Sequence, residues 1–113
     1  MRIAMGQLNP TVGDFAGNLL RIEETLISLR ESRPDLAVFP EMFLTGYPPR
    51  DLLERDWFVR RAAETLERVL SLSKAHADTA LLVGTVTRSA SGPGKGLLNS
   101  AALIRNGELL ALR

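Results

Sequence analysis

Short apolar runs alternate along the chain with longer amphipathic segments, and this order constrains the fold more than any other feature. The runs lie at residues 2–8, 36–39 and 79–86. Segments of helical periodicity separate them, at residues 15–30 and 57–74. A strand–helix–strand–helix–strand order predicts an α/β fold with parallel strands joined by helices. The two inner runs do not alternate with polar residues, so we expect their strands to be buried on both faces.

Hydrophobic periodicity supports both helices. In the first, apolar side chains recur every three or four residues, at Phe15, Leu19, Ile22, Leu26 and Leu29. In the second, one face carries Phe58, Ala62, Leu66, Val69 and Ser73. Asp14, just before the first helix, has the side chain expected of an N-terminal cap.

The order changes after residue 88. A polar, glycine-rich stretch precedes two further apolar segments, residues 98–104 and 108–112, which flank Asn106-Gly107. Asn-Gly between two strands is a strong signal for a type I′ β-hairpin, because both residues tolerate positive φ. We therefore expect an antiparallel pair that extends the sheet at one edge. The chain reads as one domain or as part of one, since its last residues form an apolar strand without a helix to cover it.

Composition excludes several classes of function. The net charge is +1, and the arginines are spread among glutamates, so no basic face for nucleic acid is expected. No apolar run reaches the roughly 20 residues of a membrane span, and the amino terminus lacks a signal-peptide pattern, so we expect a cytoplasmic protein. The 113 residues contain no cysteine, which excludes disulfides and thiol chemistry within them.

Glu41 stands where chemistry is expected in such a fold. It follows the apolar run at residues 36–39 directly after Pro40, and a stretch rich in turn residues comes next at 45–49. In open α/β sheets, ligands bind outside the carboxyl ends of the strands. The pattern alone also allows a structural glutamate at the start of a loop.

The sequence around Glu41 resembles a known family. F-P-E at residues 39–41, followed by L-T-G-Y-P-P-R-D-L-L at residues 44–53, is similar to the first active-site segment of the carbon–nitrogen hydrolase, or nitrilase, superfamily. G-Y-P-P with the following D-L-L is most similar to the glutaminase domains of glutamine-dependent NAD synthetases. Weaker similarities occur at residues 1–10, 12–14, 17–18, 99–101 and 106–107.

This resemblance implies a fold and a reaction. The fold is an α-β-β-α sandwich, of which residues 1–113 would be an incomplete, amino-terminal part. The reaction is the hydrolysis of glutamine to glutamate and ammonia. In the parent enzyme a synthetase domain would use this ammonia, ATP and magnesium to amidate nicotinic acid adenine dinucleotide to NAD. The implied partners are glutamine, the remainder of the glutaminase domain, the synthetase domain and further copies in a homo-oligomer, with no cofactor bound by this chain itself.

The resemblance also assigns site residues. Members of the family hydrolyse amides with a cysteine nucleophile, a glutamate as general base and a lysine that stabilises the oxyanion. Glu41 matches the glutamate, and we expect Phe39 and Phe43 to bury it partly, which would favour proton uptake. Tyr47 matches a tyrosine of the glutamine pocket, where a ring with a hydroxyl suits the substrate. Tyr47 packing only its own turn is the alternative. The family's lysine would follow Arg113.

The remaining polar candidates have structural interpretations. Lys74 closes a helix, where a cation is favourable against the dipole. Lys95 lies in G-P-G-K-G, which lacks the Ser or Thr that follows the lysine of a phosphate-binding loop. His76 is the single histidine, and without cysteine or a second histidine no metal site is predicted. Asn99 and Ser100 are expected to form structural hydrogen bonds near the site.

Two other functions remain open. In the first case, the chain belongs to a stand-alone carbon–nitrogen hydrolase that acts on ω-amides, N-carbamoyl compounds or nitriles. In the second case, it belongs to a different class of protein. It would then be a truncated, non-catalytic α/β module that binds partners through its open sheet edge.

Overall fold

The computed structural model describes residues 1–46, 52, 55–88 and 97–113. Its helices and strands follow the predicted order. They are β1 (Ile3–Met5), α1 (Phe15–Ser28), β2 (Leu36–Val38), α2 (Asp56–Ser73), the short 3₁₀ helix η2 (Lys74–His76), β3 (Ala80–Arg88), β4 (Leu97–Arg105) and β5 (Glu108–Leu112).

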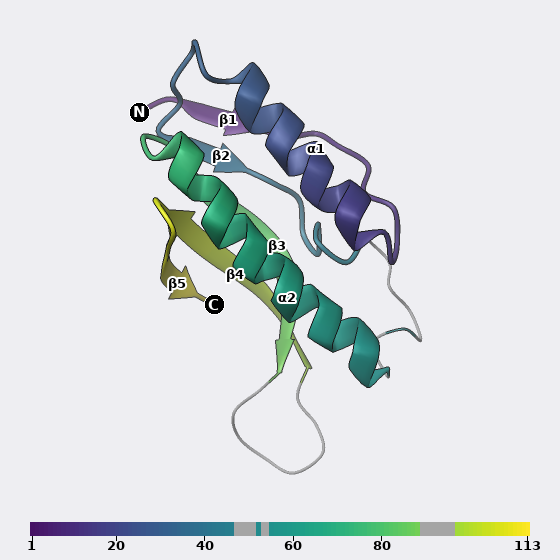
Figure 1. Cartoon of the computed structure of the whole chain (residues 1–113). Coiled ribbons are helices and arrows are strands. Elements are labelled where there is room, and N and C mark those ends of the chain that lie inside the picture. Colours follow the sequence, from purple (N-terminus) through teal and green to yellow (C-terminus); the bar gives the residue numbers. More distant parts are fainter. Residues whose placement is uncertain (47–51, 53–54, 89–96) are drawn as a thin grey trace.

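The five strands form one mixed sheet, in the order β1-β2-β3-β4-β5. β1, β2 and β3 are parallel, whereas β4 is antiparallel to both β3 and β5. Asn106 and Gly107 connect β4 to β5 with φ angles of 47° and 80°, the positive values that a type I′ turn requires. The predicted α/β class, with parallel strands joined by helices and an antiparallel hairpin at one edge, is confirmed (Figure 1).

Both helices lie on the same face of the sheet (Figure 1). One row of side chains, aligned across β2, β3 and β4, is buried beneath the helices: it contains Ala37, Leu81 and Ile104. The adjacent aligned row is Met5, Val38, Leu82, Leu103 and Ala111, and none of these residues is buried. The prediction that the inner strands are buried on both faces is therefore wrong for β2 and the first residues of β3, because the described residues supply one helix layer. It holds for residues 83–86 of β3, which are all buried. The helix layer and the sheet correspond to half of an α-β-β-α sandwich.

The core lies between the helices and the sheet. Ile22 and Leu26 of α1 and Val69 of α2 pack there against side chains of β3 and β4. Burying one such side chain fully stabilises the fold by about 1.5–3 kcal/mol. A second apolar cluster at the other end of the helices contains Phe15 and Phe58, whose ring centroids are 5.1 Å apart.

The ends of two elements show how local interactions set boundaries. Asp14 caps α1 as predicted, since its side chain accepts a hydrogen bond from the main-chain N of Gly17 at 3.0 Å. β1 is shorter than the predicted strand at residues 2–8. Its last main-chain bond to β2 runs from Gly6 N to Val38 O at 2.8 Å, after which the chain turns toward the start of α1.

Candidate active site

Glu41 lies at the carboxyl end of β2, where the chain leaves the sheet. The main-chain N of Phe39 donates to Leu82 O of β3 at 2.8 Å, and that of Leu44 donates to Gly84 O at 3.2 Å. Residues 40–43 therefore form a loop between two main-chain bonds to β3, the first at Leu82 and the second at Gly84. We call residues 40–46 the Glu41 loop.

Buried side chains anchor the Glu41 loop. Phe43, Leu44 and Thr45 are fully buried, and the ring of Phe43 packs against that of Phe39 with centroids 5.5 Å apart. Glu41 itself is exposed. The partial burial expected for Glu41 is thus absent, because the described residues cover the backbone of the loop and leave its carboxylate in solvent.

A glycine lets the Glu41 loop rest directly on the sheet. A Cβ atom at Gly84 would lie 2.5 Å from Met42 N and 2.6 Å from Pro40 O, distances that no real Cβ tolerates. Met42 also has a φ of 51°, a left-handed conformation that is uncommon for a residue with a side chain. Such a conformation costs on the order of 1–3 kcal/mol, and it persists only where surrounding contacts determine it. Here it occurs next to the candidate catalytic residue.

Asn18 ties the Glu41 loop to α1. Its side chain is fully buried, and its Nδ2 donates to Leu44 O at 3.2 Å and to Thr11 O at 2.9 Å. Its Oδ1 accepts from Thr11 N at 2.9 Å. The sequence alone does not predict this role. The available signal is an asparagine between Phe15 and Ile22, on the buried face of an amphipathic helix.

Asn99 of β4 contacts Glu41 across 58 positions of sequence: its Nδ2 donates a hydrogen bond to Glu41 Oε1. In the sheet, Asn99 pairs with Val86 of β3. The neighbouring Ser100 is buried, and its Oγ lies 2.7 Å from Thr87 Oγ1. The prediction that Asn99 and Ser100 form hydrogen bonds near the site is confirmed for Asn99, whereas Ser100 forms its hydrogen bond within the sheet.

The other predicted candidates are Tyr47, Lys95, Lys74 and His76. Tyr47 and Lys95 lie outside the described residues. Lys74 begins η2, where its side chain lies beside Gly107 of the hairpin, at the far end of β4 from Asn99. Within the described residues, no group of three or more His, Asp or Glu side chains could hold a metal ion. In the same part of the chain, no helix is long and apolar enough to cross a bilayer.

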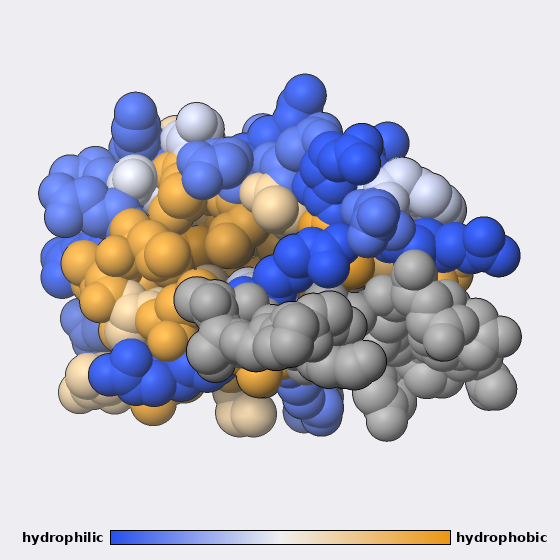
Figure 2. All heavy atoms as spheres, turned by 90° about the horizontal axis from the view of Figure 1, so that it is seen from below, coloured by the Kyte–Doolittle hydropathy of each residue, from blue (hydrophilic) through white to orange (hydrophobic). Residues whose placement is uncertain are grey.

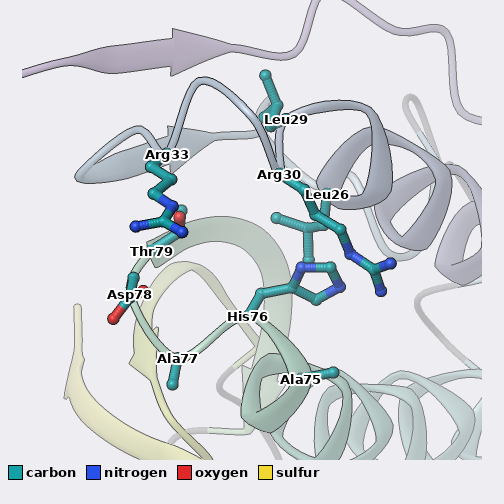
Figure 3. A pocket seen from close by; sticks show the side chains of 9 residues that line it. All are labelled: Leu26, Leu29, Arg30, Arg33, Ala75, His76, Ala77, Asp78 and Thr79. Carbon is teal, nitrogen blue, oxygen red and sulfur yellow. The ribbon is translucent and has the colours of Figure 1, made fainter.

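His76 lines a cavity of about 250 Å³ near the amino-terminal ends of β2 and β3, opposite to Glu41 (Figure 3). Its imidazole points toward Leu26 and Arg30. Burial lowers the pKa of His76, and the Arg30 guanidinium lowers it further, against a smaller opposing effect of Glu23. Arg30 and Arg33 line the same cavity just beyond the carboxyl-terminal end of α1, where the helix dipole favours cations.

Known proteins are similar to this chain in sequence and in fold. Residues 2–113 match the carbon–nitrogen hydrolase family. The chain is 36% identical over 99% of its length to a glutamine-dependent NAD(+) synthetase from Thermotoga maritima, and spans 18% of that protein. It is 39% identical over 95% of its length to a glutamine-dependent NAD(+) synthetase from Synechocystis sp., and spans 19% of it.

The similarity extends to solved structures. An amidase from Nesterenkonia sp. is 25% identical and superposes with a TM-score of 0.81, over 99% of this chain and 41% of the amidase. The similarity in sequence and in fold thus extends over almost the whole chain, including the strand end that bears Glu41. The chain belongs to the carbon–nitrogen hydrolase family.

Proposed function

We propose that residues 1–113 are the amino-terminal part of the glutamine-hydrolysing domain of a glutamine-dependent NAD synthetase. Two such synthetases are similar to the chain over nearly its whole length. The observation that carries the proposal is the position of Glu41, a carboxylate on a firmly anchored loop at a strand end, with Asn99 bonded to it. The partners in this proposal are glutamine, the rest of the glutaminase domain, a synthetase domain and further copies in a cytoplasmic homo-oligomer.

Glu41 acts as the general base in this reaction. A thiol is mostly protonated at neutral pH, so a positioned carboxylate must take its proton before the sulfur attacks the amide carbon. The proton then goes to the leaving nitrogen, which departs as ammonia, and an acyl-thioester remains. Glu41 next takes a proton from the water that hydrolyses the thioester, and returns it to the thiol as glutamate is released. A lysine stabilises the oxyanion at each step.

The cysteine and the catalytic lysine of this mechanism come from outside the 113 residues. Tyr47 contributes to the glutamine pocket, with its ring against the methylene groups of the substrate. ATP and magnesium act in the synthetase domain.

The purified 113-residue chain is expected to release no glutamate from glutamine, because it contains no cysteine nucleophile. A coupled assay for glutamate, with the full-length protein as positive control, measures this. Turnover by the isolated chain that is abolished by Glu41→Gln would contradict the prediction.

The full-length protein that carries this chain provides the test of function. It is expected to form NAD from nicotinic acid adenine dinucleotide and ATP with either glutamine or free ammonia as nitrogen donor, and to release glutamate only with the former. Formation of NAD from ammonia but not from glutamine would overturn the assignment of glutamine hydrolysis to this domain.

A stand-alone amidase is the second candidate, and the superposition on the Nesterenkonia amidase favours it. Such an enzyme would hydrolyse ω-amides, N-carbamoyl compounds or nitriles without ATP and would form no NAD. The third candidate, a non-catalytic α/β binding module, is favoured by the lack of cysteine in the 113 residues. A protein of this kind would hydrolyse none of these compounds.

A further inference from the structure

We propose that Asn99 is a positioning residue that holds the Glu41 carboxylate in the orientation needed to accept a proton. This inference rests on the proposed function of Glu41. It concerns a residue on a different strand, 58 positions away, whose contact with Glu41 is a single hydrogen bond from Nδ2 to Oε1.

The backbone of Glu41 is held in place by the loop, whereas its side chain is exposed. Main-chain bonds to Leu82 and Gly84 and the burial of Phe43 hold the loop, whereas Glu41 is exposed. An exposed glutamate has three rotatable side-chain bonds and samples many rotamers. Asn99 lies on β4, which is paired with β3 at every residue from 97 to 104, and Asn99 itself pairs with Val86. A bond from this rigid strand therefore selects one orientation of the carboxylate.

The chemistry of the contact suits a general base. An ionised carboxylate only accepts hydrogen bonds, so the asparagine must present its NH₂ group. This group is neutral, so it holds the carboxylate by a hydrogen bond without adding the charge of a lysine or arginine. Within the part of the chain that the structure describes, Oε2 of Glu41 accepts no hydrogen bond. The hydrogen bond from Asn99 thus holds one of the two carboxylate oxygens, Oε1.

Ser100 provides a matched control on the same strand. Its hydroxyl lies 2.7 Å from Thr87 Oγ1 and donates a long bond to Leu98 O at 3.4 Å, and neither of these bonds involves Glu41. The charged pair at the end of β3, Arg88 with Asp56 of α2 at 2.7 Å, is likewise bonded within itself. Ser100→Ala therefore removes a hydrogen bond from β4 without changing the environment of the carboxylate.

Steady-state kinetics of the full-length protein with glutamine test the role of Asn99. Asn99→Leu is nearly isosteric but cannot donate, and its kcat is expected to fall by roughly 10- to 100-fold with KM changed by less than about 3-fold. This loss is smaller than the ~10²–10⁴-fold contribution of a general base itself. Ser100→Ala is expected to keep kcat within about 2-fold of the wild type.

Asn99→Asp gives a readout that a purely structural role would not move. At pH 8 the introduced carboxylate repels that of Glu41, and we expect kcat below that of Asn99→Leu. As the pH falls, the introduced group gains a proton and can donate in place of the amide. Its kcat relative to the wild type is therefore expected to rise between pH 8 and pH 5.5.

Three results would overturn the inference. They are wild-type kcat in Asn99→Leu, equal losses in Asn99→Leu and Ser100→Ala, or a constant ratio of Asn99→Asp to wild type across the pH range. Thermal unfolding of each variant, compared with the wild type, reports folding of the domain that carries Asn99. If Asn99→Leu fails this control, the pH dependence of the isosteric Asn99→Asp decides. Glu41→Gln in the same assay separates the two claims, since full activity in that variant would refute the proposed function itself.

Discussion

At the scale of single residues, close packing between the Glu41 loop and β3 depends on the missing side chain of Gly84. The loop backbone passes over this glycine at distances that exclude a methyl group. Met42 adopts positive φ at the same place. The position of the candidate base therefore depends on a residue that carries no chemistry.

Replacing Gly84 with alanine is expected to displace the Glu41 loop. Overpacking at a buried site costs about 1–3 kcal/mol of folding free energy, and part of this strain can be relieved by lifting Pro40 and Met42 from the sheet. We expect a lower Tm and a reduced kcat for glutamine hydrolysis in the full-length protein.

Ala101→Gly is the control for Gly84→Ala, because Ala101 is the cross-strand partner of Gly84 and its methyl group is removed rather than added. This variant is expected to retain the wild-type kcat. Unchanged Tm and kcat in Gly84→Ala would contradict the close approach of loop and sheet.

At the scale of elements, the sequence predicts what depends on local pattern. The helix boundaries predicted from hydrophobic periodicity agree with those of α1 and α2 within about two residues. Asn106-Gly107 forms the turn of the predicted hairpin. Tertiary contacts could not be predicted, because a single sequence does not indicate which distant residues contact each other. The contacts of Asn18 with Leu44 and of Asn99 with Glu41 span 26 and 58 positions. The strand-end position of Glu41 also allows a structural glutamate, so its candidacy as the general base depends on the resemblance to a family.

Asn18 connects three elements, and its replacement tests that connection. Asn18→Leu preserves size but leaves the buried main-chain oxygen of Leu44 and the partly buried main-chain N and O of Thr11 without their partners. Each such group costs about 1–3 kcal/mol, so we expect a loss of roughly 2–4 kcal/mol in urea unfolding. Leu20→Asn is the inverse exchange on the exposed side of the same helix, where Leu20 is 52% exposed. It should change stability by no more than about 0.5 kcal/mol.

At the scale of the whole molecule, apolar surface remains uncovered on the side where β4 and β5 lie (Figure 2). Leu98, Leu109, Leu110 and Leu112 are 38–53% exposed there. β5 is also an edge strand with free main-chain groups along one side. The same sheet exposes Met5 on its other edge strand. These surfaces are expected of a chain that spans about a fifth of the length of its curated relatives.

The isolated 113-residue chain is therefore expected to self-associate. Sedimentation velocity should show an average mass that rises with concentration, and Leu110→Lys should reduce this rise because a charge on an edge strand opposes pairing. Leu20→Lys, at an exposed leucine of α1, is the control and should leave association unchanged. A monodisperse monomer with a cooperative melt would contradict the expectation.

The role of Glu41 as proton acceptor is tested most directly by the rate of glutamate release from glutamine in the full-length protein carrying Glu41→Gln. We predict a fall in kcat of about 10²–10⁴-fold, since the amide cannot take a proton from the thiol, while NAD formation from free ammonia stays at the wild-type rate. A Glu41→Gln protein that releases glutamate as fast as the wild type would contradict the assignment.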